Sequence, residues 1–156
     1  MTKIKIDFTY HRVLLGTAEA QLDEHQHPIA IVTAQMAVEV RIDEALRKLL
    51  GTYPELPTEA LMNVLPDRTM MQRSMRALWE ALTGDSIKNA QAWKEYHRHV
   101  ERRNRLVHGG EQWSRYDDAE VSLATVRSMI SHIDQVEKRV LASGGPGTRR
   151  PRPAGA

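Results

Sequence analysis

The sequence contains no cysteine at any of its 156 positions. This absence excludes disulfide bonds, zinc sites built from thiolates and catalysis by a cysteine nucleophile. It suits a reducing compartment, in which disulfides are rare. Any chemistry therefore has to come from other side chains.

Long apolar runs are missing as well. No stretch approaches the roughly 20 apolar residues that a membrane-spanning helix needs. The first ten residues, MTKIKIDFTY, lack the apolar core of a signal peptide. We expect a cytoplasmic protein that makes no contact with a membrane.

Clustered metal ligands are a third absence. The carboxylates that a metal-dependent nuclease needs do not stand out as a group. His97 and His99, two positions apart on a helix, point about 200° away from each other and cannot share an ion. His25 and His27 could share one, although histidines in a loop beside a proline are usually solvated. We predict no metal site and no cofactor.

What the sequence does contain is helical periodicity. Its 41% hydrophobic and 27% charged residues fit one compact domain. Apolar residues recur at helical spacing over residues 11–24, 29–50, 68–84 and 86–108, and from 117 to about 140. Gly51 and Gly84 are expected to end two of these helices, and Asp85 or Ser86 is expected to cap the helix that follows Gly84. The segment 52–66 holds three prolines and is predicted to be a connecting loop. The sequence thus predicts an all-α, up-and-down bundle of about five helices over residues 11–142.

The helix over residues 29–50 is the most apolar and is expected to be the central helix of the bundle. It is nearly apolar on all sides through Val40 and turns amphipathic only after Arg41. Glu39 lies in this apolar part, so we expect it to be buried and paired. The expected partner is an arginine, either Arg102 or Arg103.

Both ends of the chain are predicted to lie outside the bundle. Residues 1–10 alternate between apolar and polar side chains, which is typical of a strand. Such a strand would pair with another chain or lie extended over the bundle. Residues 143–156 are rich in Gly, Pro and Arg and are expected to form a disordered basic tail, either solvated or in contact with nucleic acid.

Positive charge is concentrated in the second half of the chain. Residues 86–156 carry 13 basic and 8 acidic side chains, against 9 and 12 in residues 1–85. Three of the arginines fall in ERRNRLVHGG, residues 101–110, at the end of a predicted helix. The apolar side of that helix, as defined by Trp93, Val100 and Val107, is continued by Arg103 and Asn104. Polar side chains therefore replace apolar ones where the helix is expected to meet another surface.

The end of this helix brings Arg103, Asn104 and His108 near one another. Asn104 and His108 are one turn apart and share a face. Arg103 and His108 are about 140° apart, so they converge only if the arginine curls over or the last turn unwinds, which Gly109 and Gly110 permit. The helix C-terminus favours a protonated imidazole through the macrodipole. Basic residues followed by Gly-Gly are also an ordinary way to end a helix.

The segment RRNRLVHGG resembles the motif of the HEPN superfamily (higher eukaryotes and prokaryotes nucleotide-binding). That motif is an arginine, a polar residue, and a histidine four to six positions after the arginine, and Arg103, Asn104 and His108 fill these places. AIVTAQMAVEVRIDEAL is similar to the early long helix of the family, and LWEALTGDSI to its helix-to-helix joint. The likeness spans roughly residues 10–141.

This resemblance implies a homodimeric, metal-independent endoribonuclease that serves as a toxin or an antiviral-defence effector. The two motif helices would face each other and form a composite site from Arg103, Asn104 and His108 of both chains. His108 would act on the 2′-hydroxyl proton or the leaving oxygen, and Arg103 would stabilise charge on the phosphorane. Asn104 would orient the pair or the phosphate. The expected products carry a 2′,3′-cyclic phosphate and a 5′-hydroxyl.

Other residues are candidates for supporting roles. Arg98, Arg102 and Arg105 would attract the RNA backbone. Arg98 could instead pair with a glutamate on the same helix. Glu39 and Gly109 are expected to support the site from behind and from the helix end.

A regulatory protein such as an antitoxin is a further expected partner. In relatives paired with a nucleotidyltransferase antitoxin, a tyrosine two positions after the motif histidine becomes modified, and Gly110 stands at that place here. Many HEPN relatives also bind without cleaving. The sequence therefore leaves a second hypothesis open, a noncatalytic HEPN-like dimerisation module that binds RNA, a nucleotide or a partner protein.

Overall fold

The computed structural model describes residues 9–65, 69–110 and 113–146. These residues form six α-helices and one short 3-10 helix: α1 (Tyr10–Asp23), α2 (His27–Leu50), α3 (Thr58–Val64), α4 (Arg73–Thr83), η1 (Ile87–Asn89), α5 (Trp93–His108) and α6 (Tyr116–Ala142). The predicted all-α bundle is confirmed. Among the described helices, none combines the length and the apolar character needed to cross a membrane.

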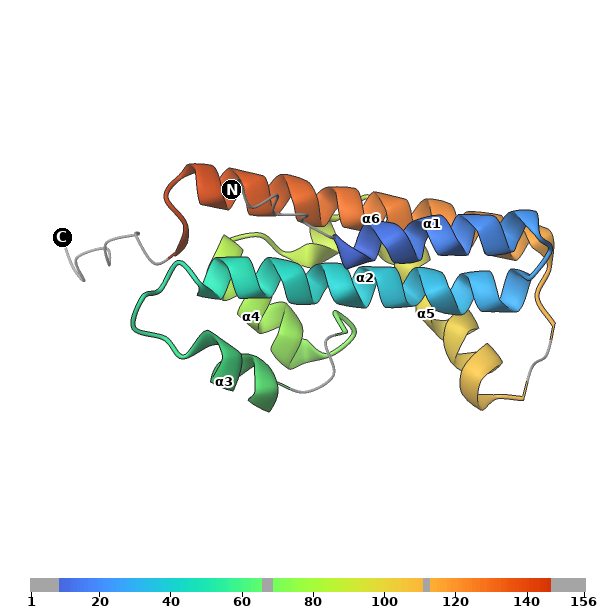
Figure 1. The fold of residues 1–156 in the computed structure, drawn as a ribbon, viewed down its shortest axis with the longest axis horizontal. Coiled ribbons are helices and arrows are strands. Elements are labelled where there is room, and N and C mark those ends of the chain that lie inside the picture. Colours follow the sequence, from blue (N-terminus) through green and yellow to red (C-terminus); the bar gives the residue numbers. More distant parts are fainter. Residues whose placement is uncertain (1–8, 66–68, 111–112, 147–156) are drawn as a thin grey trace, which may run out of the picture.

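The helices α1, α2 and α6 lie side by side along the long axis of the molecule (Figure 1). α2 contacts every other α-helix of the described chain, which confirms its predicted central place. α3 and α4 lie toward the C-terminal end of α2, and α5 lies toward its other end (Figure 1). The groove between α2 and α5 is therefore open along one side of the bundle.

The core forms where the apolar side of each helix meets α2. Fully buried side chains include Ile31, Ile42, Leu46 and Leu49 of α2, Met75 and Trp79 of α4, Tyr96 of α5, and Leu123 and Met129 of α6. Burial of each aliphatic side chain of this kind stabilises the fold by roughly 1.5–3 kcal/mol. Because Tyr96 belongs to this set, the first turn of α5 is fixed in the core.

The prediction of a connecting loop over residues 52–66 is wrong in its second half, where α3 lies. Pro57 is the N-cap of this helix, a position that needs no backbone N–H, so it does not oppose helix formation. Glu59 lies in the first turn, where the helix dipole favours an acid, and it also pairs with Arg47 of α2. Met62 is buried and anchors α3 to the core.

The prediction of one continuous helix over residues 86–108 is wrong in its first part. A 3-10 turn, η1, comes first, and the α-helix begins only at Trp93. Asp85 was expected to cap the helix, but its carboxylate accepts hydrogen bonds from Trp79 Nε1 at 3.3 Å and from His132 Nε2 at 2.9 Å. These tertiary contacts use the carboxylate that a cap would have needed.

α4 also begins later than the apolar pattern over residues 68–84 indicates. The guanidinium of Arg76 donates hydrogen bonds to the carbonyl oxygens of Met70, at 2.9 Å, and of Met71. These two residues are therefore held in a turn ahead of the helix. At the other end Gly84 terminates α4 as predicted, in a left-handed conformation with φ 69°.

The two predicted appendages fall largely outside the described residues. Of the predicted strand over residues 1–10, residues 1–8 lie outside, so the strand stays a prediction. Tyr10 was assigned to that segment but is the first residue of α1.

Part of the predicted C-terminal tail packs onto the bundle. The backbone N–H of Gly145 donates to the carbonyl oxygen of Val140 at 3.0 Å and closes the end of α6. A Cβ at position 145 would lie 2.6 Å from the Cγ2 atom of Thr52, so this glycine allows close packing against the turn after α2. The remainder of the predicted tail, residues 147–156, lies outside the described chain.

Candidate functional site

A cleft of about 840 Å³ lies between α2 and α5. Its volume falls in the range of small-molecule sites, roughly 300–1,000 Å³. α2 and α5 form two of its walls, and residues just before α4 contribute to a third. The cleft brings together the predicted site residues Glu39, Arg103, Asn104 and His108.

Arg103 and Asn104 form a bonded pair on the α5 wall. Arg103 Nη1 donates a hydrogen bond to Asn104 Oδ1 at 3.0 Å. Arg103 is half-buried, and its Nε is buried without a hydrogen-bond partner among the described residues. A guanidinium nitrogen without a partner retains a donor that an anionic ligand could use.

His108 lies on the last turn of α5 and is exposed. The turn does not unwind: the N–H of Gly109 donates to the carbonyl oxygen of Arg105 at 2.9 Å, which continues the α-helical pattern. Only Gly110, with φ 69°, leaves the helix. Of the two routes by which Arg103 and His108 could converge on one cleft, the structure uses the reach of the arginine.

Gly109 has a packing reason to be a glycine. A Cβ at this position would lie 2.7 Å from the carbonyl oxygen of Arg105, closer than such contacts normally come. A side chain at this position would therefore crowd the last turn of α5.

The prediction that Val107 continues the buried side of α5 is wrong. Val107 is 46% exposed, whereas Tyr96 and His99 are fully buried. The apolar pattern was misleading because the two buried side chains are polar ones that the core can accommodate through hydrogen bonds. Their spacing of three residues on the inner side of a helix was the signal in the sequence.

Behind the cleft, Gln35 joins α2 to α5. Its side-chain oxygen lies 3.1 Å from His99 Nε2, and its amide donates to Tyr96 Oη at 3.2 Å and to Glu39 Oε1 at 2.9 Å. Because the Gln35 oxygen can only accept, His99 carries its hydrogen on Nε2. Hydrogen bonds thereby connect Gln35, Tyr96 and His99 to the Glu39 carboxylate in the cleft.

Burial and neighbouring charge keep His99 neutral. Desolvation, followed by the positive charges of Arg102 and Arg103, lowers the pKa of His99 to about 3. Desolvation also raises the pKa of Tyr96 above its ordinary value. Both Tyr96 and His99 are therefore uncharged at neutral pH.

Glu39 differs from its prediction. It is half-buried, and it accepts its hydrogen bond from Gln35, so the predicted pairing with an arginine is wrong within the described chain. Arg103 lines the same cleft, but it forms no ion pair with Glu39 among the described residues. The sequence pointed to a buried acid that needs a donor, but a neutral amide one turn away on the same helix supplies that donor.

The three predicted RNA-binding arginines have different environments. Arg102 donates to Ser122 Oγ at 2.7 Å and lies 3.6 Å from an Asp118 oxygen, so it holds α5 against α6. Arg98 pairs with Glu95 on its own helix, the alternative that the sequence left open. Arg105 is exposed.

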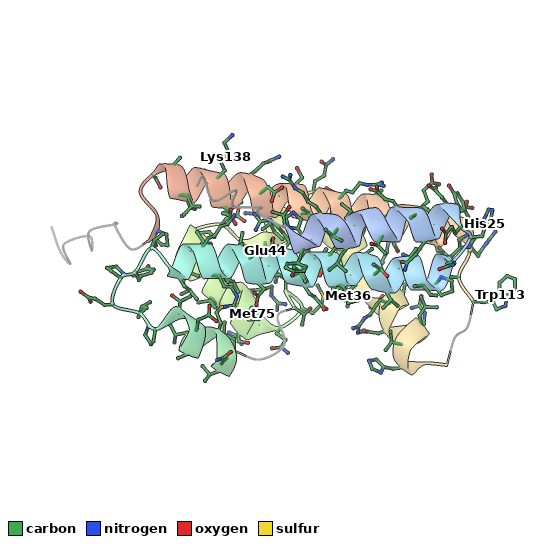
Figure 2. All side chains as sticks on the ribbon, viewed as in Figure 1. His25, Met36, Glu44, Met75, Trp113 and Lys138 are labelled. Atoms are coloured by element: carbon green, nitrogen blue, oxygen red, sulfur yellow. The ribbon has the colours of Figure 1, made fainter. Side chains whose placement is uncertain are left out.

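The remaining histidines do not form a metal site with their neighbours. His97 is exposed and its Nδ1 lies 3.4 Å from a Glu101 oxygen, on the side of α5 away from His99, as the spacing predicts. The rings of His25 and His27 meet edge to face with centroids 5.9 Å apart. They lie at the end of the bundle from which Trp113 projects (Figure 2). Within the described residues no group of three or more His, Asp or Glu side chains could hold a metal ion.

A second hollow of about 400 Å³ adjoins the cleft. It shares Asn104 and Val100 with the main cleft and is lined beyond them by Lys88 and Arg76. Neither cation was singled out in the sequence, because each comes from a different segment and only the fold places them together. They extend the basic wall away from α2.

The site combines an exposed imidazole, a guanidinium with an unused donor and a side-chain amide. This set can transfer a proton and stabilise a developing negative charge. Comparisons of the chain with family models, curated proteins and solved structures returned no match. The function is therefore argued from the cleft and the motif.

Proposed function

We propose that the protein is a metal-independent endoribonuclease that acts as a homodimer. The observation that carries this proposal is that Arg103, Asn104 and His108 all line one cleft on the open side of α5. Their order and spacing are those of the HEPN motif. The proposed cellular role is that of a toxin or an antiviral-defence effector, controlled by an antitoxin or another regulatory protein.

The proposed reaction is transfer of the RNA chain's phosphorus from its 5′-oxygen to the neighbouring 2′-oxygen. His108 of one subunit removes the 2′-hydroxyl proton as the new P–O bond forms, and the second His108 returns a proton to the departing 5′-oxygen. Arg103 stabilises the negative charge on the pentavalent phosphorane, and Asn104 keeps the guanidinium oriented. The products are a 2′,3′-cyclic phosphate and a 5′-hydroxyl.

Dimerisation through α5 is supported by exposed apolar side chains on α2 and α5, the two helices that border the cleft. Met36, near the middle of α2 (Figure 2), and Val107 of α5 are each 46% exposed. A second copy of the chain would cover them, and a twofold axis would place the two His108 side chains about one shared site. Exposed basic side chains on α5, such as Arg105, would attract the RNA backbone.

A noncatalytic binding module is the second candidate, and one observation favours it. Two of the three predicted RNA-binding arginines, Arg98 and Arg102, are used in pairs within the fold, and the cleft itself contains Glu39 and Asp43. A site that binds one nucleotide needs fewer free cations than a track for a long RNA.

The proposed reaction is tested with end-labelled single-stranded RNA in excess EDTA, with DNA of the same sequence as the control. We expect RNA cleavage with cyclic-phosphate ends and intact DNA, because the attacking group is the 2′-hydroxyl. Binding of RNA without cleavage across varied sequences would favour the noncatalytic module.

A further inference from the structure

The two walls of the cleft carry opposite charge. The α5 wall presents Arg103 and His108, whereas the α2 wall presents the acids Glu39 and Asp43. Arg47 also lines the α2 wall, but its guanidinium binds Asp43 at 2.6 Å and Glu59. A phosphate therefore fits the α5 wall, and the α2 wall suits a neutral group that donates hydrogen bonds.

The Glu39 carboxylate is oriented before any ligand arrives. Gln35, which donates to Glu39 Oε1 at 2.9 Å, is only 2% exposed and is itself held by His99 and Tyr96. Both amide hydrogens of Gln35 are committed, so its orientation is set. A carboxylate has about four lone-pair positions, so Glu39 retains acceptors on both oxygens for a ligand in the cleft.

Among the RNA bases, guanine matches such an acceptor best. Its Watson–Crick edge presents two adjacent donors, the N1–H and the exocyclic amino group, which can meet the two oxygens of one carboxylate. Adenine and cytosine place a ring-nitrogen acceptor beside their amino group, and uracil has one donor between two carbonyls. Each of these edges would set an acceptor against the carboxylate, which binding sites penalise.

The cleft also has apolar surface for the faces of a base. Val40 of α2 and Val100 of α5 line it, together with Leu65 and Met71 from the segments around α3 and α4. Aliphatic side chains of this kind can enclose a flat ring while polar groups fix its orientation. The arrangement thus provides walls for the base, an acceptor for its edge and cations for its phosphate.

We propose that Glu39 is a specificity-determining residue that accepts hydrogen bonds from the Watson–Crick edge of guanine, so that the protein selects guanosine in RNA. The expected consequence of this recognition is cleavage next to guanosine, and that consequence rests on the proposed function. The recognition of the base itself does not require cleavage.

Binding is measured first, with the full chain and guanosine 3′-monophosphate, inosine 3′-monophosphate and adenosine 3′-monophosphate titrated separately by calorimetry in EDTA. Inosine lacks the exocyclic amino group and loses one of the two bonds. We expect binding weaker by about tenfold for inosine, which loses one bond, and by about a hundredfold for adenosine, because a bidentate contact to a base edge discriminates by up to about that factor. Equal binding of the three nucleotides would overturn the proposal.

Glu39→Gln tests the carboxylate directly, and Glu101→Gln on the exposed side of α5 is the matched control. We expect the first variant to lose the preference for guanosine over adenosine and the second to keep it. Thermal melts check that both variants fold, and the inosine comparison needs no variant at all. A Glu39→Gln protein that still prefers guanosine would contradict the assignment.

Cleavage separates this inference from the proposed function. An RNA with a single guanosine among uridines and adenosines should be cut beside that guanosine, and its inosine counterpart about tenfold more slowly. Cleavage at all bases equally would keep the nuclease and overturn the base recognition. Selective guanosine binding without any cleavage would keep the base recognition and overturn the nuclease. No nucleotide binding at millimolar concentration, with uniform or absent cleavage, would overturn the recognition as well.

Discussion

His99 Nε2 lies 3.1 Å from the side-chain oxygen of Gln35, and both side chains are buried between α5 and α2. Two residues earlier on the same helix, His97 is exposed and paired with Glu101. Burial lowers the pKa of His99 to about 3, so this side chain stays neutral at pH values where an ordinary histidine is charged. This contrast makes the buried contact testable without any knowledge of the function.

Stability should fall as the pH drops below the ordinary pKa of histidine. Between about pH 6.5 and pH 3 the unfolded chain protonates His99 and the folded chain does not, so the unfolding free energy rises with pH in that window. We expect His99 to contribute roughly 1 kcal/mol to the loss between pH 6 and pH 5. Urea denaturation at the two pH values should show a smaller loss for His99→Gln than for wild type. An unchanged loss in His99→Gln, or an equal effect of His97→Gln, would contradict the buried neutral histidine.

The buried ion network between α2 and α6 should contribute more than any surface pair. Arg41 is 3% exposed and donates to Asp134 at 2.6 Å and to Glu137 at 2.8 Å. Arg41→Ala leaves the Glu137 carboxylate without its main partner, and we expect a cost of about 3–5 kcal/mol in urea denaturation. Arg127→Ala removes a solvent-exposed pair with Glu19 and should cost less than about 1 kcal/mol. Similar losses in both variants would argue against this network.

Two glycines should respond in opposite directions to alanine. Gly84 ends α4 with φ 69°, so Gly84→Ala should destabilise the fold by about 1 kcal/mol. Gly16 lies inside α1, and a Cβ there would meet nothing within 4 Å, so Gly16→Ala should stabilise by about 0.5–1 kcal/mol. The midpoints of thermal unfolding give the sign of each change. A stabilised Gly84→Ala would mean that α4 does not end in the left-handed turn.

The proposed dimer predicts that a charge introduced at one exposed valine breaks the assembly, whereas a charge at another does not. Val107 of α5 is 46% exposed and Val121 of α6 is 44% exposed. Val107→Asp should shift the mass seen by light scattering from twice the 17.8 kDa of one chain to a single chain, because a charge would be buried at the interface. Val121→Asp should leave the dimer intact. A monomeric wild type, or a dimer insensitive to Val107→Asp, would rule out assembly through α5.

The sequence predicted the elements whose formation depends on local pattern. The unbroken apolar character through Val40 identified α2 as the central helix, and Gly51 and Gly84 marked helix ends. The motif at the end of α5 pointed to Arg103, Asn104 and His108, which the fold does bring to one cleft. Spacing on one helix places Asn104 and His108 on one face, but it does not by itself place Arg103 in the same cleft.

What the sequence missed depends on contacts between distant segments. α3 was taken for a loop because its prolines outweighed a short helical run, yet Pro57 stands just outside the helix. Asp85 was expected to be a cap, but the tertiary partners Trp79 and His132 compete for it. The role of Gln35 could not be anticipated, because its partners His99 and Tyr96 belong to another helix.

The most direct test of the central claim is the single-turnover rate of RNA cleavage in excess EDTA by wild type, His108→Ala and His97→Ala. The last variant removes an exposed histidine of the same helix that does not line the main cleft. If His108 transfers the proton, its loss should slow cleavage by about 10²–10⁴-fold, and His97→Ala should cleave at the wild-type rate with cyclic-phosphate ends. Equal rates for wild type and His108→Ala, or cleavage that requires added metal, would contradict the account.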